Sequence, residues 1–278
     1  MDSYLRPADL ATALHALGAA RFRVVAGATD YYPQIASART DERMLDITAL
    51  PDLRGIERHP TGWRIGCLAT WSDVVASPLP PAFDGLKQAA RQVGGRQIQN
   101  AGTLAGNICN ASPAADGVPC LLALDASVEL ASARGRRILK LADFIQGPRR
   151  TALRPDEMLL ALHIPEHGGV SRFEKLGARA YLVISIAMVA VWAKLEAGRI
   201  AEARIAVGAC GPVATRLPEL EASLIGQEPT HATIEPHHLT PLRPIDDVRA
   251  PATYRRHAAE ELIRRTITSL TTSSELAA

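Results

Sequence analysis

Two stretches of small residues in this chain have the composition of a phosphate-binding site. The first is Ala26-Gly27-Ala28-Thr29-Asp30, directly after a strand expected at Arg21–Val25, and the second runs from Gln97 to Asp116. Neither stretch contains Lys or Arg, but both present consecutive backbone N–H groups with little side-chain bulk in the way. Oriented peptide dipoles of this kind bind pyrophosphate. The sequence therefore predicts a dinucleotide held by main-chain amides rather than by salt bridges.

The better-known phosphate fingerprints are absent. The sequence has no G-x-x-x-x-G-K-[ST] and no G-x-G-x-x-G between a strand and a helix, which excludes a P-loop and the doubly wound dinucleotide-binding fold. Taken separately, each stretch also fits a hairpin turn or a surface loop. We predict the second stretch as an irregular loop because it is poor in large apolar residues, and long loops inside compact domains are usually functional.

The other chemically reactive residues do not form a recognisable site. Cys67, Cys109, Cys120 and Cys210 include no C-x-x-C pair and no ferredoxin-type spacing, so we predict four mostly buried thiols and no iron–sulfur cluster on this chain. The eight histidines are scattered, and we predict no metal site. No nucleophile motif is present, so no catalytic residue is predicted.

Composition and charge exclude several classes of protein. Among the 278 residues, 47% are hydrophobic and 22% are charged, which is typical of a globular protein. The net charge of +2 gives no electrostatic reason to expect nucleic acid or a membrane surface as the partner. The N-terminus does not read as a signal peptide, and the longest apolar stretch, residues 181–193, is shorter than the ~20 residues of a spanning helix. We therefore expect a cytoplasmic protein with no membrane span.

The first half of the chain is predicted to mix helices and strands around the two stretches. A helix should begin at Pro7 and be stopped by Gly18, and Thr70 or Ser72 should cap another. Gly94-Gly95 should end a helix that begins at Pro81. The further elements expected are strands at Met44–Ile47, Trp63–Leu68, Val128–Ala131, Arg137–Leu141 and Met158–Ile164, and a helix at Val118–Leu124.

The pattern changes after the segment Pro165–Val170, which we take as a domain boundary between residues 1–168 and 169–278. Strands are expected at Ser171–Leu176, Ile184–Leu195 and Ile200–Gly208, the last two joined by a hairpin at Ala197-Gly198. Helices are expected at Val213–Ile225 and Ala252–Leu270. The fold class is thus α+β, with a small antiparallel sheet covered by helices in the second domain.

Taken together, the two stretches and their spacing resemble the FAD-binding (medium) subunit of the molybdenum hydroxylases, the family of xanthine dehydrogenase and carbon monoxide dehydrogenase. Ala26–Tyr31 is similar to its A-G-G-[TH]-[DNS]-L motif, and Asn100–Ala126 to [RQ]-N-x-A-T-[IL]-G-G-N-[IL], A-S-P-A-A-D and P-x-L-L-A-L-x-A. Pro155–Leu159, the Lys175 region and Pro244–Arg249 with Tyr254-Arg255-Arg256 also fit. The likeness covers nearly the whole chain, and it implies a two-part FAD-binding domain (PCMH/VAO-like) followed by a domain of the carbon monoxide dehydrogenase flavoprotein C-terminal type.

The resemblance also implies which residues bind FAD. Asp116 would accept a hydrogen bond from a ribose or ribityl hydroxyl, and Leu159 and Lys175 would lie against the flavin ring or its polar edge. The alternatives are a core position for Leu159 and a solvated surface charge for Lys175. The residues that would hold the pyrophosphate and its surroundings are Ala26, Gly27, Ala28, Thr29 and Asp30 from the first stretch and Thr103, Gly106 and Asn107 from the second.

Some positions depart from the family pattern. Ala28 and Ala105 stand where glycine is common. Because a left-handed alanine costs about 1–2 kcal/mol, we expect a negative φ at both. The usual R-N before the second stretch is Gln99-Asn100 here, which removes one cation. None of these changes removes a backbone N–H.

The resemblance further implies an electron-transfer subunit of a heterotrimer, itself duplicated by twofold symmetry. A large molybdopterin subunit would oxidise the substrate, a [2Fe-2S] subunit would relay single electrons, and FAD on this chain would pass them to an external acceptor. The substrate (purine, N-heterocycle, aldehyde or carbon monoxide) and the acceptor (NAD, oxygen, quinone or carrier protein) stay open. Two alternatives also stay open: a self-sufficient FAD-dependent oxidoreductase, and an assembly or structural subunit that has lost FAD. The helix with Arg255, Arg256, Arg264 and Arg265 is either a docking face or a solvated cationic face.

Overall fold

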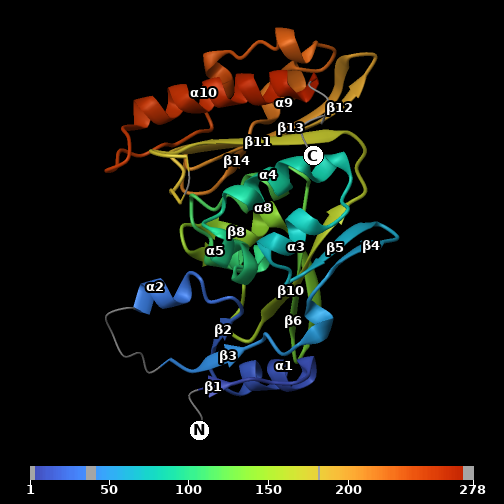
Figure 1. Cartoon of the computed structure of the whole chain (residues 1–278), viewed down its shortest axis with the longest axis vertical. Coiled ribbons are helices and arrows are strands. Elements are labelled where there is room, and N and C mark those ends of the chain that lie inside the picture. Colours follow the sequence, from blue (N-terminus) through green and yellow to red (C-terminus); the bar gives the residue numbers. More distant parts are fainter. Residues whose placement is uncertain (1–3, 36–41, 181, 272–278) are drawn as a thin grey trace. The chain divides into compact units, whose positions relative to one another are not determined.

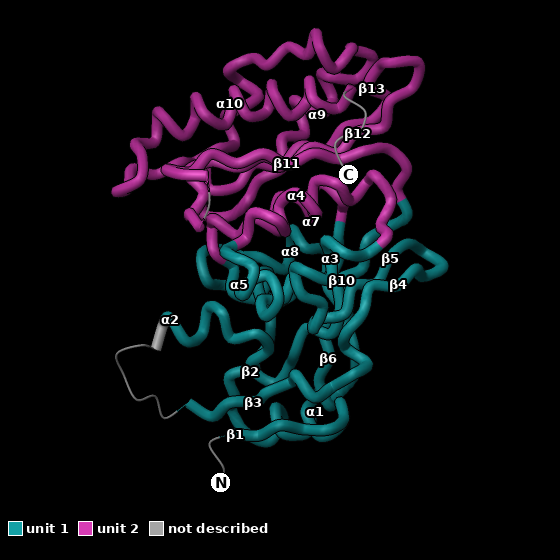
Figure 2. The backbone as a smooth tube through the Cα atoms, in the orientation of Figure 1, with its two compact units in different colours: residues 1–77, 94–111, 126–166 teal, residues 78–93, 112–125, 167–278 magenta. Residues whose placement is uncertain are grey.

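The computed structural model describes residues 4–35, 42–180 and 182–271. The chain divides into two compact units (Figure 2). Unit 1 comprises residues 1–77, 94–111 and 126–166, and unit 2 comprises residues 78–93, 112–125 and 167–278. The chain therefore crosses between the units several times, and its last crossing is at residues 166–167.

Unit 1 is built on an antiparallel sheet of five strands with the order β4-β5-β10-β6-β7 (Figure 1). Alternation of apolar and polar residues directs Val128 and Leu130 of β6 into the core, where both are fully buried. The strands of this sheet are β4 (Ile56–His59), β5 (Gly62–Gly66), β6 (Ser127–Ser132), β7 (Gly135–Lys140) and β10 (Met158–Pro165). A parallel sheet contains β1 (Tyr4–Leu5), β3 (Met44–Asp46) and β2 (Arg23–Val25), and a small hairpin contains β8 (Ile145–Gly147) and β9 (Arg150–Thr151).

The helices of unit 1 begin at recognisable caps. The Asp9 carboxylate accepts from the Thr12 amide at 2.8 Å, and Thr70 forms a capping box with Asp73, which confirms the predicted Thr70 cap. The prediction that Gly18 stops the first helix is wrong, because the helix continues through Gly18 to Ala19. The helices are α1 (Leu10–Ala19), α2 (Tyr31–Ile35), α3 (Trp71–Ala76), α5 (Arg96–Ala101), α6 (Leu104–Asn110) and α8 (Leu141–Phe144).

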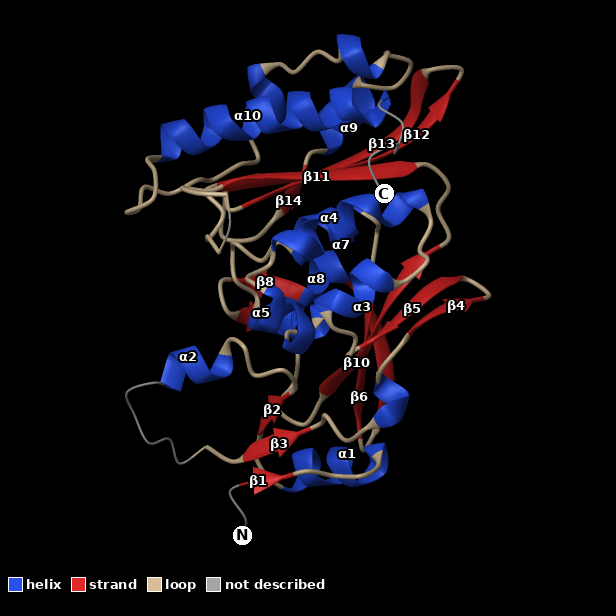
Figure 3. Cartoon of the chain, viewed as in Figure 1, coloured by secondary structure: helices blue, strands red, loops and turns tan. Residues whose placement is uncertain are grey.

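Unit 2 is an antiparallel sheet with helices on both faces (Figure 3). Val189 and Val191 of β12 point toward the core that contains Ile263 and Ile267 of α10, whereas α4 and α7 pack on the sheet as well. The strands are β11 (Val170–Leu176), β12 (Ala187–Glu196), β13 (Arg199–Gly208) and β14 (Thr215–Arg216); the helices are α4 (Asp84–Gln92), α7 (Gly117–Ala123), α9 (Pro218–Ser223) and α10 (Ala252–Thr268).

The predicted α+β class and the long hairpin are confirmed. Ala197 and Gly198 both have positive φ, 48° and 77°, and Glu196 pairs with Arg199, so a two-residue turn of type I′ geometry joins β12 to β13. The helix predicted from Val213 is wrong in its first part, because Thr215–Arg216 pairs with β13 as β14 and the helix begins only at Pro218.

The prediction that Gln97–Asp116 is an irregular loop is also wrong. Most of it is helical, with α5 ending at Ala101 and α6 beginning after Thr103. Both helices are short, and each is held from outside by backbone bonds, such as the Leu104 amide to the Ala69 carbonyl at 3.1 Å. Tertiary contacts of this kind stabilise helices too short to form by themselves.

Within the described residues, no helix combines the length and the hydrophobicity that crossing a bilayer requires.

Candidate functional site

The first stretch is a tight turn between β2 and α2. The Ala28 carbonyl accepts the amides of Tyr31 and Tyr32 at 3.1 and 3.2 Å, and these bonds start α2. To make the turn, Ala28 adopts φ of +56°. Our expectation of a negative φ is therefore wrong for Ala28, whereas Ala105, inside α6, does have a helical backbone. The left-handed alanine costs about 1–2 kcal/mol, which the rest of unit 1 must offset.

The amides of this turn are available to a ligand. None of the N–H groups of residues 27–30 donates a hydrogen bond to another described residue. The same is true of the Thr29 hydroxyl. Residues 26–29 are half-buried, so these donors are neither paired nor fully solvated. Successive unpaired amides around an αL residue form an anion-binding concavity.

The second stretch lies directly against the first, within unit 1. A methyl group built on Gly27 would lie only 1.7 Å from the Ala101 carbonyl oxygen, and one built on Gly102 would lie 3.2 Å from Thr29 Oγ1. Gly27 is therefore required by the close approach of the two backbones. The two stretches singled out in the sequence form one cluster.

The second stretch contributes side chains more than amides. Three of the first four amides in α6 are engaged: Leu104 with Ala69, Asn107 with the Thr103 carbonyl, and Gly106 with Thr103 Oγ1 at 3.0 Å. Because the Thr103 oxygen accepts that bond, its O–H hydrogen remains to donate, and it has no acceptor among the described residues. Gly106 is exposed and Asn107 is half-buried on the same short helix.

The predicted pair Gln99-Asn100 anchors this cluster. Asn100 Oδ1 accepts from the Ser72 hydroxyl at 2.5 Å, which ties α5 to α3, and Gln99 is buried. Gln99, which stands where the family pattern has a cation, is a buried neutral side chain.

These donors fit a pyrophosphate group. Main-chain amides and the hydroxyls of Thr29 and Thr103 can each donate to phosphate oxygen, and hydrogen bonds to charged groups contribute about 1.5–3 kcal/mol each. The carboxylate of Asp30 cannot donate, and it is exposed, so only its amide suits such a ligand.

Asp116 and Lys175 form a buried ion pair in unit 2. Lys175 Nζ lies 2.7 Å from Asp116 Oδ2, and the two side chains are only 5% and 8% exposed. Lys175 also donates to the Gln92 carbonyl at 3.2 Å. Burial raises the pKa of the Asp116 carboxyl, and the attraction of Lys175 opposes this shift. The alternative in which Lys175 is a solvated surface charge is wrong.

Sequence reasoning missed a third member of this group. The Ser185 hydroxyl donates to Asp116 Oδ1 at 2.7 Å and is buried. Serine inside the apolar run 181–193 carries no motif, so only the geometry identifies it.

Leu159 is buried in unit 1, on β10 next to a register shift in its pairing with β6. One of the two acidic residues of the segment Pro155–Leu159, Glu157, accepts two bonds of 2.7 Å from the Arg137 guanidinium. The Pro155–Leu159 motif thus contains an ion pair that holds β7 beside the segment before β10.

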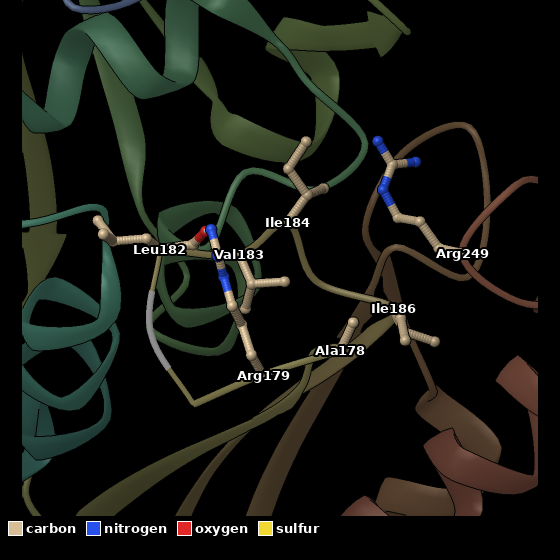
Figure 4. Close-up of a pocket in the computed structure, with 7 residues that line it drawn as sticks. All are labelled: Ala178, Arg179, Leu182, Val183, Ile184, Ile186 and Arg249. Atoms are coloured by element: carbon tan, nitrogen blue, oxygen red, sulfur yellow. The ribbon is translucent and has the colours of Figure 1, made fainter.

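Unit 2 contains a hollow of about 450 Å³ (Figure 4). Its walls include Leu182, Val183, Ile184 and Ile186, and Arg249 reaches it from the loop before α10. Ile184 and Ile186 flank Ser185 in the chain. The hydroxyl of the residue between them is directed at Asp116.

The four cysteines are free thiols. Three of the four thiols are buried, Cys109 is half-buried and none forms a disulfide, which confirms the predicted environment. Burial raises the pKa of Cys67 and of Cys109 to about 12. Across residues 4–35, 42–180 and 182–271, no three His, Cys, Asp or Glu side chains cluster as metal ligands would.

Arg255 does not belong to a docking or solvated face. Its side chain is 3% exposed and bonds to Asp247 at 2.6 Å and to the Ile186 carbonyl at 2.7 Å. The expectation that it shares an exposed cationic face with Arg264 and Arg265 is wrong, because α10 turns Arg255 inward and leaves those two paired with Glu260 and Glu261.

Known proteins are similar to this chain over nearly its whole length. Residues 1–167 match the family model described as the FAD binding domain in molybdopterin dehydrogenase, and residues 172–270 match the CO dehydrogenase flavoprotein C-terminal domain. The chain is 31% identical over 276 residues to the xanthine dehydrogenase FAD-binding subunit of Escherichia coli O157:H7, covering 95% of this chain and 94% of that protein.

Two further relatives extend the comparison. The nicotinate dehydrogenase FAD-subunit of Eubacterium barkeri is 34% identical over 220 residues, which cover 76% of this chain and 74% of that protein. Among solved structures, reconstituted CO dehydrogenase from Oligotropha carboxidovorans matches with a TM-score of 0.86 at 26% identity, covering 95% of both chains.

Proposed function

Because the chain belongs to the FAD-binding subunits of the molybdenum hydroxylases, and is thus the flavoprotein part of an oxidoreductase, we propose that it is the electron-transfer subunit of a heterotrimer. It would receive electrons from an iron–sulfur subunit with [2Fe-2S] clusters, and pass them to an external acceptor. A large molybdopterin subunit would oxidise the substrate. The complex would be a dimer of heterotrimers in the cytoplasm.

One observation carries the assignment of FAD to this chain. The backbone of Gly27 lies against the Ala101 carbonyl, so the unpaired amides of residues 27–30 lie in the same cluster as the stretch that carries the Thr103 hydroxyl. Bound FAD would supply the capacity to exchange electrons one or two at a time. The chain's own residues bind and orient it.

The roles of individual residues follow from their donors. Residues 26–30 would hold the pyrophosphate by amides and by the Thr29 hydroxyl, with Thr103, Gly106 and Asn107 beside them. Asp116 would accept from a ribose or ribityl hydroxyl, because a carboxylate oxygen has lone pairs left after its bonds to Lys175 and Ser185. Leu159 and Lys175 would lie at the flavin ring or its edge. We propose residues 1–168 and 169–278 as the corresponding domains.

Exposed apolar side chains support the presence of partner subunits. Leu182, Ile184, Ile245 and Val248 are each more than half exposed, and Leu182 and Ile184 line the same hollow as Arg249. Exposed apolar side chains that gather at one place on a surface, as Leu182 and Ile184 do at this hollow, mark interaction surfaces. The relatives are named for xanthine, nicotinate and CO dehydrogenases, so the substrate of the complex is a property of the partner chains.

Flavin retention tests the FAD assignment. The purified chain should carry FAD or bind it on reconstitution, and Thr103→Val should retain much less because the hydroxyl donor and the α6 cap are both lost. Asp9→Ala is the matched control: it removes the α1 cap at a similar cost of about 1 kcal/mol, but it should retain FAD as the unmodified chain does. A colourless chain that cannot be reconstituted refutes the proposal and favours the structural alternative.

Turnover tests the electron-transfer role. The isolated FAD-loaded chain should show no substrate oxidation, and activity should require co-expression with the iron–sulfur and molybdopterin subunits. Sustained substrate turnover by the isolated chain would instead establish a self-sufficient flavoenzyme.

A further inference from the structure

Three side chains from separate segments of unit 2 meet in the interior. Lys175 is the next-to-last residue of β11, Asp116 precedes α7, and Ser185 lies just before β12. Lys175 holds Oδ2 of Asp116 and Ser185 holds Oδ1, both at 2.7 Å. Each carboxylate oxygen therefore has its own donor, and the carboxylate cannot rotate without breaking a bond.

The backbone that follows Ser185 is fixed by two hydrogen bonds of Ile186. The Ile186 amide donates to the Leu176 carbonyl at 2.7 Å, and the Ile186 carbonyl accepts from the buried Arg255 guanidinium at 2.7 Å. Ser185 itself is 2% exposed. Its hydroxyl is thus positioned by β11 and α10 before any ligand arrives.

Lys175 has one donor left. Its ammonium bonds to Asp116 and to the Gln92 carbonyl, and an ammonium has three hydrogens. No described residue accepts the third. The polar edge of a cofactor can accept a hydrogen bond from this third N–H, provided that the ion pair with Asp116 holds the Lys175 ammonium in position.

We propose that Ser185 is a positioning residue for the flavin edge: its hydroxyl holds the Asp116 carboxylate in place, and Asp116 in turn fixes the ammonium of Lys175. The inference rests on the proposed function, because it concerns the electrostatics of the same FAD site. Ser185 acts through Asp116 and has no catalytic role of its own.

The charges around Asp116 are few. Lys175 faces it from β11, and the thiol of Cys120 lies near it on α7, with its sulfur 3.7 Å from the Asp116 carbonyl. Burial raises the pKa of Cys120 well above its ordinary value, so this thiol stays neutral at and below neutral pH. Burial also raises the pKa of Asp116. Removal of the Ser185 donor adds to that shift, because the ionised carboxylate loses a hydrogen bond.

The test is the pH at which Asp116 takes up its proton. In the FAD-loaded full chain, the midpoint potential of the flavin should be measured against pH by spectroelectrochemistry. Protonation of Asp116 should appear as a step in the plot of midpoint potential against pH. In Ser185→Ala we expect this step to move to a pH about one to two units higher. Below the step the potential should be more positive, because the protonated Asp116 leaves a more positive local charge. Ser185→Thr keeps a hydroxyl and should restore the original profile.

Ser171→Ala is the matched control. Ser171 is another buried serine of unit 2, and its hydroxyl accepts the Gly85 amide at 2.8 Å. Its loss should destabilise the chain without moving the step. If Ser185→Ala does not fold, Ser185→Cys, a weaker donor of similar size, should give a smaller upward shift.

The outcomes separate this inference from the proposed function. An unchanged step in Ser185→Ala with FAD bound overturns the inference and leaves the FAD assignment standing. If the chain binds no FAD, the proposed function fails, and the ionisation of Asp116 is then followed by carboxyl ¹³C NMR in the free chain. An unchanged titration there would overturn the positioning role as well, and an upward shift would retain it.

Discussion

Replacement of Gly27 by alanine is the most direct test of the cluster in unit 1. The added methyl would lie 1.7 Å from the Ala101 oxygen and 2.4 Å from its carbon, whereas real contacts essentially never fall below 3.0 Å. The two stretches must therefore separate by at least 1.3 Å, the difference between 3.0 and 1.7 Å. Both obstacles are backbone atoms, so no side-chain rotation can relieve the clash.

The expected loss of folding free energy in Gly27→Ala follows from overpacking. Insertion of a methyl into a fixed contact costs about 1–3 kcal/mol, and the depth of this overlap places Gly27→Ala at about 2 kcal/mol or above. For a chain of this size the melting temperature should fall by roughly 4–8 °C. FAD retention should fall further than stability, because separation of the stretches moves the amides of residues 27–30 away from the Thr103 hydroxyl.

Thermal unfolding with and without FAD measures both effects. Gly18→Ala is the matched control, since a methyl there meets no atom within 4 Å and alanine in a helix is favoured over glycine by about 0.5–1 kcal/mol. We expect Gly18→Ala to be slightly more stable, with normal FAD content. The argument for a shared cluster is refuted if Gly27→Ala melts with the unmodified chain and retains its flavin.

Three further changes have defined outcomes. Ala28→Gly should raise stability by up to about 1 kcal/mol, because glycine relieves the strain at φ of +56° but loses more chain entropy on folding; a lower urea midpoint would contradict this. The four thiols should react with a thiol reagent at pH 8 only after unfolding, since burial raises the pKa of Cys67 and Cys109 to about 12; rapid labelling of the native chain would be the contrary result. Asp247→Asn should lower the melting temperature at neutral pH. The amide of Arg249 and the guanidinium of Arg255 lower the pKa of Asp247 from 3.8 to about 2, so its stabilising effect is complete above about pH 4 and fades as pH falls toward 2. If the difference in melting temperature between the unmodified chain and Asp247→Asn does not narrow between about pH 4 and pH 2, the ionised carboxylate is not the cause of the stabilisation.

The sequence predicts the long elements well because their periodic signals are strong. The β12–β13 hairpin follows from two alternating runs with Ala197-Gly198 between them, and α10 follows from its length. The second stretch was misread because α5 and α6 are each shorter than two full turns, too short for an apolar stripe to show. The Thr103 cap marks only α6 in the sequence, because α5 has no side-chain cap, and the bond from the Leu104 amide to the Ala69 carbonyl joins residues far apart in the chain.

The sequence predicts the part of the candidate site that consists of backbone amides. Small residues after a strand indicate a turn with free amides, and that prediction needs no knowledge of the partner segment. The left-handed Ala28 was missed because the local cost of αL argues against it, and only the two amides that its carbonyl accepts show what the strain achieves. Ser185 was missed for a similar reason, since a serine in an apolar run has no spacing to mark it.

The segment Pro244–Arg249 and Arg255, which fit the family pattern, also have a structural role. Asp247 bonds to Arg255 at 2.6 Å, and Arg255 donates to the carbonyls of Ile186 and Ala209. These two carbonyls lie just before β12 and just after β13, so the arginine ties both ends of the hairpin to α10. Because Ile186 follows Ser185, the acidic and basic residues of the motif support the position of the hydroxyl that holds Asp116. Arg255, one of the arginines that the sequence alone assigns to a docking or solvated face, therefore lies in the interior of unit 2, and Asp247→Asn should loosen the Ser185 bond without touching the residues proposed to meet FAD.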